Sequence, residues 1–228
     1  MTRDHAGGRP GKPPRRLHVT SSASDRCSPD ARRRGGFGKR FRGGSDDRAP
    51  FGPPEDWHEP ADAPRGDYRI VMQPPGKGFR HVVTPEEVRA RLALLPREFL
   101  ANLEVVQFSR MTRKKQRHLC YGLQWGTTVY LYPMEDDLIE RYGAPPEPRF
   151  EGEARLYGGR WRQDSDGQWE LAWSPSSIRD FYLNNILIHE VGHLVDDRNT
   201  NLRDRERFAE WFAVEYGYRP TLAQRRRA

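Results

Sequence analysis

One stretch of the chain, residues 178–197, most constrains what it can fold into. The stretch contains no proline, and its apolar residues recur at the spacing of one helix face. Ser176 and Ser177 precede it, and Asp180 follows Ser177 by three residues, which is the pattern of a capped helix start. The sequence therefore predicts a long helix that ends near Asp197 to Asn199, where turn-forming residues begin.

This predicted helix carries a His-Glu-x-x-His pattern at His189, Glu190 and His193. Residues four apart lie on the same helix face, so the two imidazoles can converge on one ion, and neutral imidazole nitrogen is a good zinc ligand. Glu190 projects from a neighbouring position, where its carboxylate can reach a zinc-bound water without binding the metal. Gly192 inside the helix costs roughly 1 kcal/mol relative to alanine and indicates a packing or functional reason. The pattern predicts a Zn²⁺ site.

A third zinc ligand is expected on a second helix, predicted from about Leu202. This helix presents Glu206 and Glu210 on one face, again four residues apart. One carboxylate could bind the metal while the other accepts the N–H of a ligand histidine, and either could instead belong to a solvated face. Asp196, one turn after His193, is a further candidate for an acid behind the ligands or a surface residue at the helix end.

The segment His189–Asp197, followed by Glu206-Arg207-Phe208-Ala209-Glu210, resembles zincin metallopeptidases of the gluzincin type. It is similar in particular to catalytic domains of the lethal-factor-like group. The resemblance implies that Glu206 is the third zinc ligand, that Glu190 is the general base, and that Glu210 lies behind a ligand histidine. Because the interval from His193 to Glu206 is only 13 residues, shorter than in those relatives, Glu210 stays an alternative ligand.

The same resemblance implies a strand at the edge of the sheet that faces the substrate. Thr127–Tyr132 and a strand of the hairpin within 155–173 are equal candidates for it. The interval between His193 and Glu206 contains no tyrosine. Tyr182, Tyr216 and Tyr218 are therefore open candidates for the group that stabilises the oxyanion.

The predicted fold class is α+β, with a small twisted sheet packed on the motif helix and a C-terminal helix after it. Thr84, Pro85 and Glu87 predict a capped helix that ends before Pro96. The remaining expectations, in chain order, are a strand at 104–109, a strand at 121–126, a strand at 127–132, a short helix at 134–142, a loop at 143–153 and a hairpin at 155–173 that turns at Asp166-Gly167.

Charge and composition divide the chain near Gly66. Residues 1–66 hold 14 Lys+Arg and 9 Asp+Glu, a net charge of +5, together with 10 Gly and 9 Pro. Residues 67–228 hold 25 and 23, a net charge of +2. So few apolar side chains cannot offset the entropy of ordering the first segment. The predicted organisation is a disordered leader at 1–66, a zincin-like domain at 67–220 and a basic tail at 221–228.

The chain has no apolar run of about 18 residues and no secretory signal, so a cytoplasmic protein without a membrane segment is expected. Cys27 and Cys120 are too few for a disulfide framework. The expected activity is zinc-dependent hydrolysis of a peptide or protein substrate. The alternative is a nucleic-acid-associated or regulatory protein without turnover, because residues 32–44 interleave arginine, glycine and phenylalanine in a way that can contact single-stranded nucleic acid.

Overall fold

The structure is a computed structural model that describes residue 54 and residues 56–60, 67–117 and 120–225. None of the helices in these ranges is long and apolar enough to span a membrane. The strands are β1 Arg69–Met72, β2 Phe79–Arg80, β3 Val105–Phe108, β4 Gly122–Trp125, β5 Thr128–Leu131, β6 Met134–Glu135, β7 Ile139–Tyr142, β8 Arg160–Gln163 and β9 Trp169–Ala172. The α-helices are α1 Pro85–Leu92, α2 Arg113–Arg117, α3 Pro148–Leu156, α4 Pro175–Phe181, α5 Leu187–Val195, α6 Leu202–Phe212 and α7 Arg219–Arg225. A 3-10 turn, η2, spans Arg97–Leu100, and two π-helical segments are η3 Tyr182–Ile186 and η4 Ala213–Tyr218.

The largest sheet has four strands in the order β1-β3-β5-β4. β1 and β5 both run parallel to β3, whereas β4 runs antiparallel to β5 and forms one edge. A two-stranded sheet joins β2 to β6, and a three-stranded sheet has the order β7-β9-β8. The result is an α+β architecture in which mixed sheets precede a pair of C-terminal helices.

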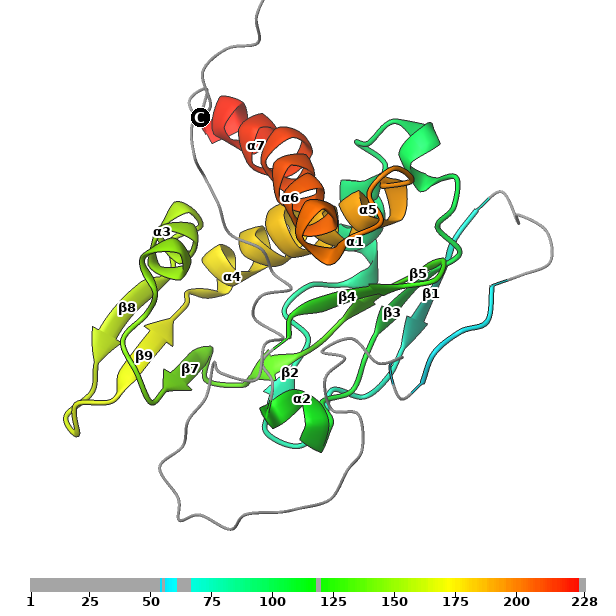
Figure 1. Cartoon of the computed structure of the whole chain (residues 1–228). Helices are drawn as coiled ribbons and strands as arrows, with labels where there is room; N and C mark the ends of the chain where they lie inside the picture. Colours follow the sequence, from blue (N-terminus) through cyan, green and yellow to red (C-terminus); the bar gives the residue numbers. More distant parts are fainter. Residues whose placement is uncertain (1–53, 55, 61–66, 118–119, 226–228) are drawn as a thin grey trace, which may run out of the picture.

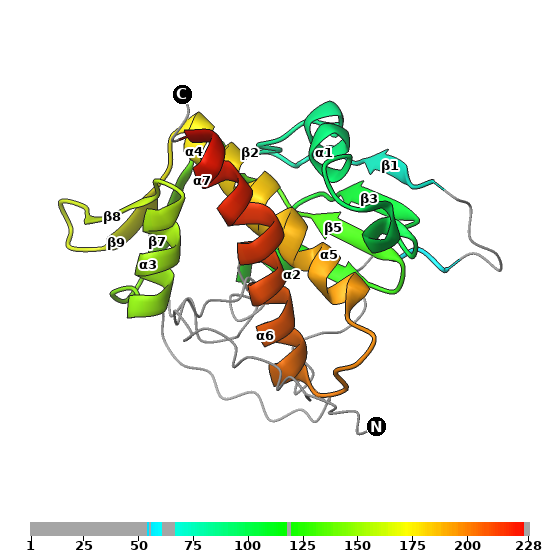
Figure 2. The same ribbon diagram turned by 90° about the horizontal axis from the view of Figure 1, so that it is seen from above.

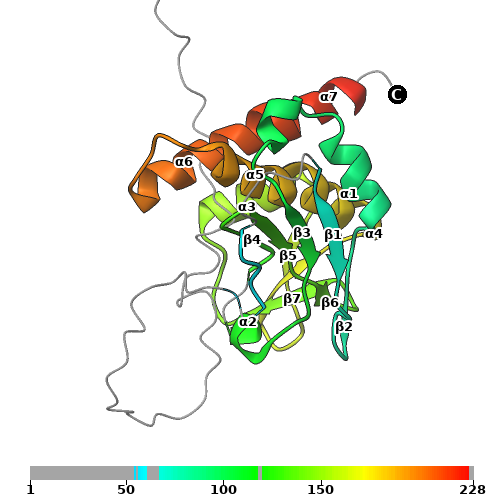
Figure 3. The same ribbon diagram turned by 90° about the vertical axis from the view of Figure 1, so that its right-hand side faces the viewer.

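Side chains alternate across the four-stranded sheet, as strand geometry requires. Val106, Phe108, Val129 and Leu131 belong to the main core. Helices α1, α4–α5 and α6–α7 lie on one side of this sheet in both Figure 1 and Figure 3. The continuous helical segment 175–195, which follows β9, therefore packs its apolar face against the sheet. This packing places His189, Glu190 and His193 beside β4.

The opposite face of the sheet carries its own contacts with an N-terminal segment. His58 Nε2 and Gln107 Oε1 are 2.6 Å apart, and the backbone N–H of His58 donates to the Tyr130 hydroxyl at 3.1 Å. Asp56 forms an ion pair with Arg110 at 3.3 Å. Of the predicted leader, residues 54 and 56–60 are thus described, and the others lie outside the described residues.

The two C-terminal helical segments, 175–195 and 202–225, run side by side in opposite directions (Figure 2). A Cβ added to Gly192 would lie 2.9 Å from the Ala209 Cα, so α5 and α6 approach closely at this crossing. A Cβ at Gly217 would likewise lie 1.9 Å from the Asn184 carbonyl oxygen, where η4 meets η3. Close helix packing therefore explains why both positions are glycine, and Gly192 needs no catalytic explanation.

The prediction of a helix at 134–142 is wrong, because this segment forms β6 and β7. The chain turns between them at Leu138, which has a φ of 57°. The buried Glu140 carboxylate then accepts hydrogen bonds from the Tyr121 and Tyr142 hydroxyls and from the Trp173 indole N–H. Tyr121 and Trp173 lie on other segments, and these tertiary partners favour the strand over the local helix propensity.

Two boundaries also differ from the sequence prediction. The segment predicted as a loop at 143–153 contains the start of α3 at Pro148, and α3 continues to Leu156, into the predicted hairpin. The motif helix begins earlier than expected, because Ser174 is its N-cap and forms a capping box with Ser177, with Pro175 at the first helical position.

The edge strand is the third difference. Thr127–Tyr132 contains β5, which lies inside the sheet between β3 and β4, and the β8–β9 hairpin belongs to a different sheet. The strand at the edge beside the motif helix is β4, which the sequence had predicted as a strand but not as the edge. Pairing order depends on contacts between distant segments, so alternation within one strand does not reveal it.

Candidate metal centre

His189 and His193 lie on α5 one turn apart and face the same side. Their Nε2 atoms are 3.1 Å apart, and both side chains are buried. The preceding segment Phe181–Ile188 is apolar enough to hold this helix against the sheet, which fixes where the two imidazoles point.

Glu206 reaches the same point from α6. Asn201 caps that helix by accepting a hydrogen bond from the Asp204 backbone N–H. Because α6 begins directly after Asn201, only a short connection separates it from the end of α5, and the chain reverses direction there. The Glu206 carboxylate oxygens lie 3.5 Å from His189 Nε2 and 3.4 Å from His193 Nε2. A possible metal site of His189, His193 and Glu206 is therefore present.

The geometry of these three side chains fits zinc. Two ligand atoms held about 2.0–2.1 Å from a tetrahedral Zn²⁺ lie roughly 3.3 Å apart. The two Nε2 atoms are 3.1 Å apart, Glu206 Oε2 lies 3.5 Å from His189 Nε2, and Glu206 Oε1 lies 3.4 Å from His193 Nε2, so each of these separations is close to that value. All three ligand atoms lie within 4.8 Å of one another, and two imidazoles with one carboxylate form a donor set common at catalytic zinc.

The charges of the site also favour a cation. Although burial opposes ionisation, hydrogen bonds with His189 and His193 lower the pKa of Glu206 to about 2. Burial disfavours the charged form of His193, but its contact with Glu206 and the charge of Glu190 raise its pKa above the usual value. The carboxylates that attract a proton to this imidazole would equally attract a divalent metal ion.

Glu190 lies on the same helix as the histidines but outside the triad. Burial raises the pKa of its carboxyl to about 7, and the nearby negative charge of Glu206 acts in the same direction. The charge of His193 and a hydrogen bond from the Gln124 backbone N–H act against this increase in pKa. Glu190 is thus a buried carboxyl group held between the metal triad and the edge strand.

Gly122 permits this close approach of β4 to the motif helix. A Cβ at this position would lie 2.7 Å from Ile186 Cγ2 and 2.9 Å from Glu190 Oε1. Real Cβ atoms do not approach other atoms so closely, so a larger residue would separate β4 from Glu190. The sequence shows a glycine at position 122, but its role in admitting Glu190 depends on which helix packs against β4.

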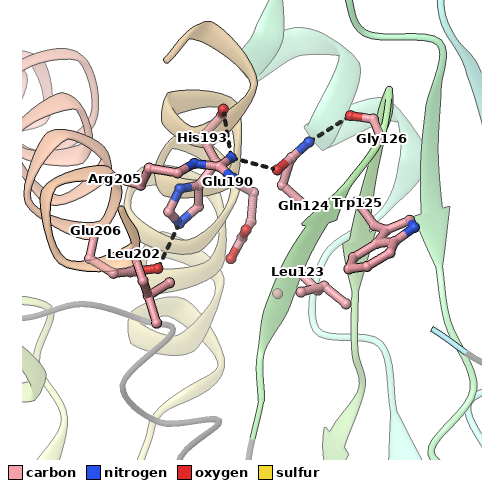
Figure 4. Close-up of a pocket in the computed structure, with 10 residues that line it drawn as sticks. Leu123, Gln124, Trp125, Gly126, Glu190, His193, Leu202, Arg205 and Glu206 are labelled. Atoms are coloured by element: carbon pink, nitrogen blue, oxygen red, sulfur yellow. Dashed lines mark hydrogen bonds and ion pairs between the residues drawn. The ribbon is translucent and has the colours of Figure 1, made fainter. Parts of the chain in front are cut away.

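A cavity of about 340 Å³ joins these groups. Figure 4 shows Glu190, His193 and Glu206 on one side of it and the edge strand on the other. Its lining consists of Gly122, Leu123, Gln124, Trp125, Gly126, Glu190, His193, Leu202, Arg205 and Glu206. The candidate metal centre is therefore open to a ligand that lies between α6 and β4.

The group of three potential metal ligands does not include Glu210 or Asp196. Glu210, one turn after Glu206, lines a different and much smaller cavity with Glu153 and Asn185. Asp196 is the C-cap residue of α5, and its carboxylate accepts hydrogen bonds from the backbone N–H and the side-chain amide of Asn199. Asp196 thus shapes the turn that leads to α6.

The tyrosines considered for the oxyanion do not line the metal cavity. Tyr182 donates its hydroxyl to the Tyr132 carbonyl at 2.8 Å, deep in the core. Tyr216 packs its ring against Phe99 and Phe212, and Tyr218 packs against Tyr157. The polar side chains that do line the cavity beside the motif acids are Gln124 and Arg205.

Sequence reasoning missed both of these residues. Gln124 lies in a predicted strand, and Arg205 lies among several charged residues of α6, so neither stands out in the printed sequence. The signal that could have indicated Arg205 is its position directly before Glu206. Comparison of the chain with known protein families, with characterised proteins and with solved structures found no match.

Proposed function

We propose that the chain is a zinc-dependent peptidase with a zincin-like fold. The single observation that carries this proposal is the convergence of His189, His193 and Glu206 beside an open cavity that His193, Glu206 and Glu190 line. Three protein ligands would leave a position on the ion for water and substrate, as catalytic zinc sites require. The arrangement of a mixed sheet over the motif helix supports the resemblance noted in the sequence.

The chain's own residues would divide the reaction among them. His189, His193 and Glu206 would hold the ion, which when bound lowers the pKa of a coordinated water toward about 7 and polarises a carbonyl group. Glu190 would accept a proton from the attacking water and deliver it to the leaving amine nitrogen. Its burial and its close contact with Gly122 of β4 would keep this carboxylate oriented toward the cavity.

The edge strand would supply the binding surface for an extended peptide. Among the described strands, β4 pairs only with β5, so its other edge lies toward the cavity. An extended peptide can add to such an edge through main-chain hydrogen bonds. This would place a peptide bond beside Glu190 and the metal ligands.

The test is cleavage of a defined peptide mixture by the zinc-loaded full-length protein in water enriched in oxygen-18. Hydrolysis puts one oxygen-18 atom into each new C-terminal carboxyl group, which mass spectrometry detects. We expect labelled products that disappear after chelation and return when zinc is added. Full zinc occupancy without any labelled product, across a mixture that samples all residue pairs, would contradict the proposal.

A further inference from the structure

We propose that Arg205 is the cationic group that contacts the substrate carbonyl oxygen during hydrolysis, and this inference rests on the proposed peptidase function. Arg205 lines the same cavity as Glu190, His193 and Glu206. In Figure 4 its side chain extends from α6 across the cavity toward β4. Of the ten residues in the cavity lining, it is the only arginine or lysine.

The guanidinium group of Arg205 has unused hydrogen-bonding capacity. Its Nη2 donates to the Gln124 side-chain oxygen at 3.3 Å and to the His193 carbonyl at 3.5 Å. Its Nε is buried and has no hydrogen-bond partner in the described part of the chain. A guanidinium has five N–H donors. A buried donor without a partner costs free energy, so an unsatisfied donor in a cavity lining indicates a possible ligand contact.

Arg205 also differs from its neighbour on α6 in lacking a carboxylate partner. Arg207 pairs with Asp204 at 3.5 Å on the exposed side of the helix. Within the described ranges, Arg205 forms no ion pair with an aspartate or glutamate within 4.0 Å. Its positive charge is therefore available to a ligand in the cavity, since no described carboxylate pairs with it directly.

Gln124 fixes the direction of this guanidinium. The Gln124 amide nitrogen donates to the Gly126 carbonyl at 2.6 Å, so the amide oxygen is turned toward Arg205. Figure 4 shows this chain of contacts from Gly126 through Gln124 to Arg205. Gln124 is thus a positioning residue that holds the cation over the cavity, beside the edge along which the peptide would lie.

The chemistry of amide hydrolysis gives this cation a role. When the water oxygen bonds to the carbonyl carbon, the π electron pair of the C=O bond moves onto the carbonyl oxygen, which becomes negative. The pair returns as the C–N bond breaks, and the proton taken up by Glu190 goes to the amine nitrogen. Arg205 donates hydrogen bonds that strengthen as the oxygen becomes charged.

The experiment compares Arg205→Met and Arg205→Lys with Arg203→Met, an exposed position on the same helix, all in the full chain. Methionine keeps much of the apolar stem but removes every donor. Kinetics use the best-cleaved peptide of the oxygen-18 screen, and calorimetry measures a phosphinic peptide of the same sequence. We expect Arg205→Met to lower kcat about 10²–10³-fold at unchanged zinc content, with a partial loss for lysine and none for Arg203→Met.

The phosphinic peptide separates contact with the developing charge from a purely structural role. Its tetrahedral anionic group resembles the charged reaction centre, so its affinity should fall with kcat/KM in Arg205→Met, while KM changes little. Gln124→Leu should cause a smaller loss that is not additive with Arg205→Met. Undiminished kcat in Arg205→Met, or a loss of kcat explained by loss of zinc, would overturn the inference alone. A wild type without turnover would overturn the proposed function as well.

Discussion

At the scale of single residues, Glu206 and Glu210 differ by one helical turn and have different surroundings. Glu206 contacts both histidines, whereas Glu210 lines the small cavity with Glu153 and Asn185. We expect Glu206→Gln to weaken zinc binding by at least about 100-fold, because a lost ligand costs more than a lost partner behind a ligand. Glu210→Gln, the matched control, should keep the wild-type affinity. Competition with a chromophoric chelator measures the zinc affinity of both variants. Equal losses of affinity would contradict the assignment of Glu206 as the third ligand.

His81 gives a residue-scale prediction that does not involve the metal. Its Nε2–H donates to the Gln73 carbonyl at 2.9 Å, and its ring meets Phe108 edge to face. Burial lowers the pKa of His81 below its usual value, although the contact with Gln73 acts in the other direction. The folded state therefore binds a proton less readily than the unfolded state does. The stability from His81 is complete above the unfolded pKa of about 6.5 and decreases as the pH falls toward the folded value.

We therefore expect wild type to lose more unfolding free energy than His81→Gln between pH 7.5 and 5.5. Urea unfolding of the two proteins at both pH values gives the difference. The candidate metal ligands and Glu190 are the same in both proteins, so their titration cancels in the comparison. Equal pH dependence in the two proteins would contradict the burial of a neutral imidazole at this position.

At the scale of elements, the α5–α6 crossing decides which residues of α6 reach the histidines. Gly192 meets Ala209 backbone to backbone at this crossing. We expect Gly192→Ala to destabilise the fold by about 2 kcal/mol, because steric overlap outweighs the gain in helix propensity. Gly152→Ala in α3 is the control, since a Cβ there meets nothing within 4 Å and should stabilise by about 0.5–1 kcal/mol. Urea unfolding measures both, and a stable Gly192→Ala protein would mean that the helices are farther apart.

The same crossing explains how much of the site could be predicted from the sequence. The four-residue spacing of His189 and His193 depends only on helix geometry, so their convergence was predictable. Helix periodicity places Glu206 and Glu210 on one face and cannot choose between them. The contact of Gly192 with Ala209 fixes the register of α6, and this tertiary contact brings Glu206 to the histidines.

The secondary-structure elements also divide into those that the local sequence predicts and those that depend on contacts with distant segments. Thr84 and Glu87 form the predicted capping box, because capping is local. The strand predictions at 104–109, 121–126 and 127–132 are confirmed in position by β3, β4 and β5. The edge position of β4 and the strand at Ile139–Tyr142 were not predictable, because pairing order and the partners of Glu140 come from distant segments.

At the scale of the whole molecule, the described residues of the candidate site come from β4, α5 and α6, and the basic segment 32–44 lies outside the described residues. Replacing the six basic residues of 32–42 with serine in the full chain should therefore leave zinc content and peptide hydrolysis unchanged. Salt-dependent binding to single-stranded nucleic acid, measured on the same proteins, tests the alternative role of this segment. Hydrolysis that falls together with nucleic-acid binding would show that the segment takes part in the activity.

In the proposed hydrolytic centre, Glu190 moves the proton. The turnover of Glu190→Gln tests this role, because the substitution is nearly isosteric and keeps all three candidate metal ligands. We expect this protein to bind zinc as wild type does and to lose about 10²–10⁴-fold in kcat, with KM little changed. Wild-type turnover by a zinc-loaded Glu190→Gln protein would contradict the proposed role of Glu190.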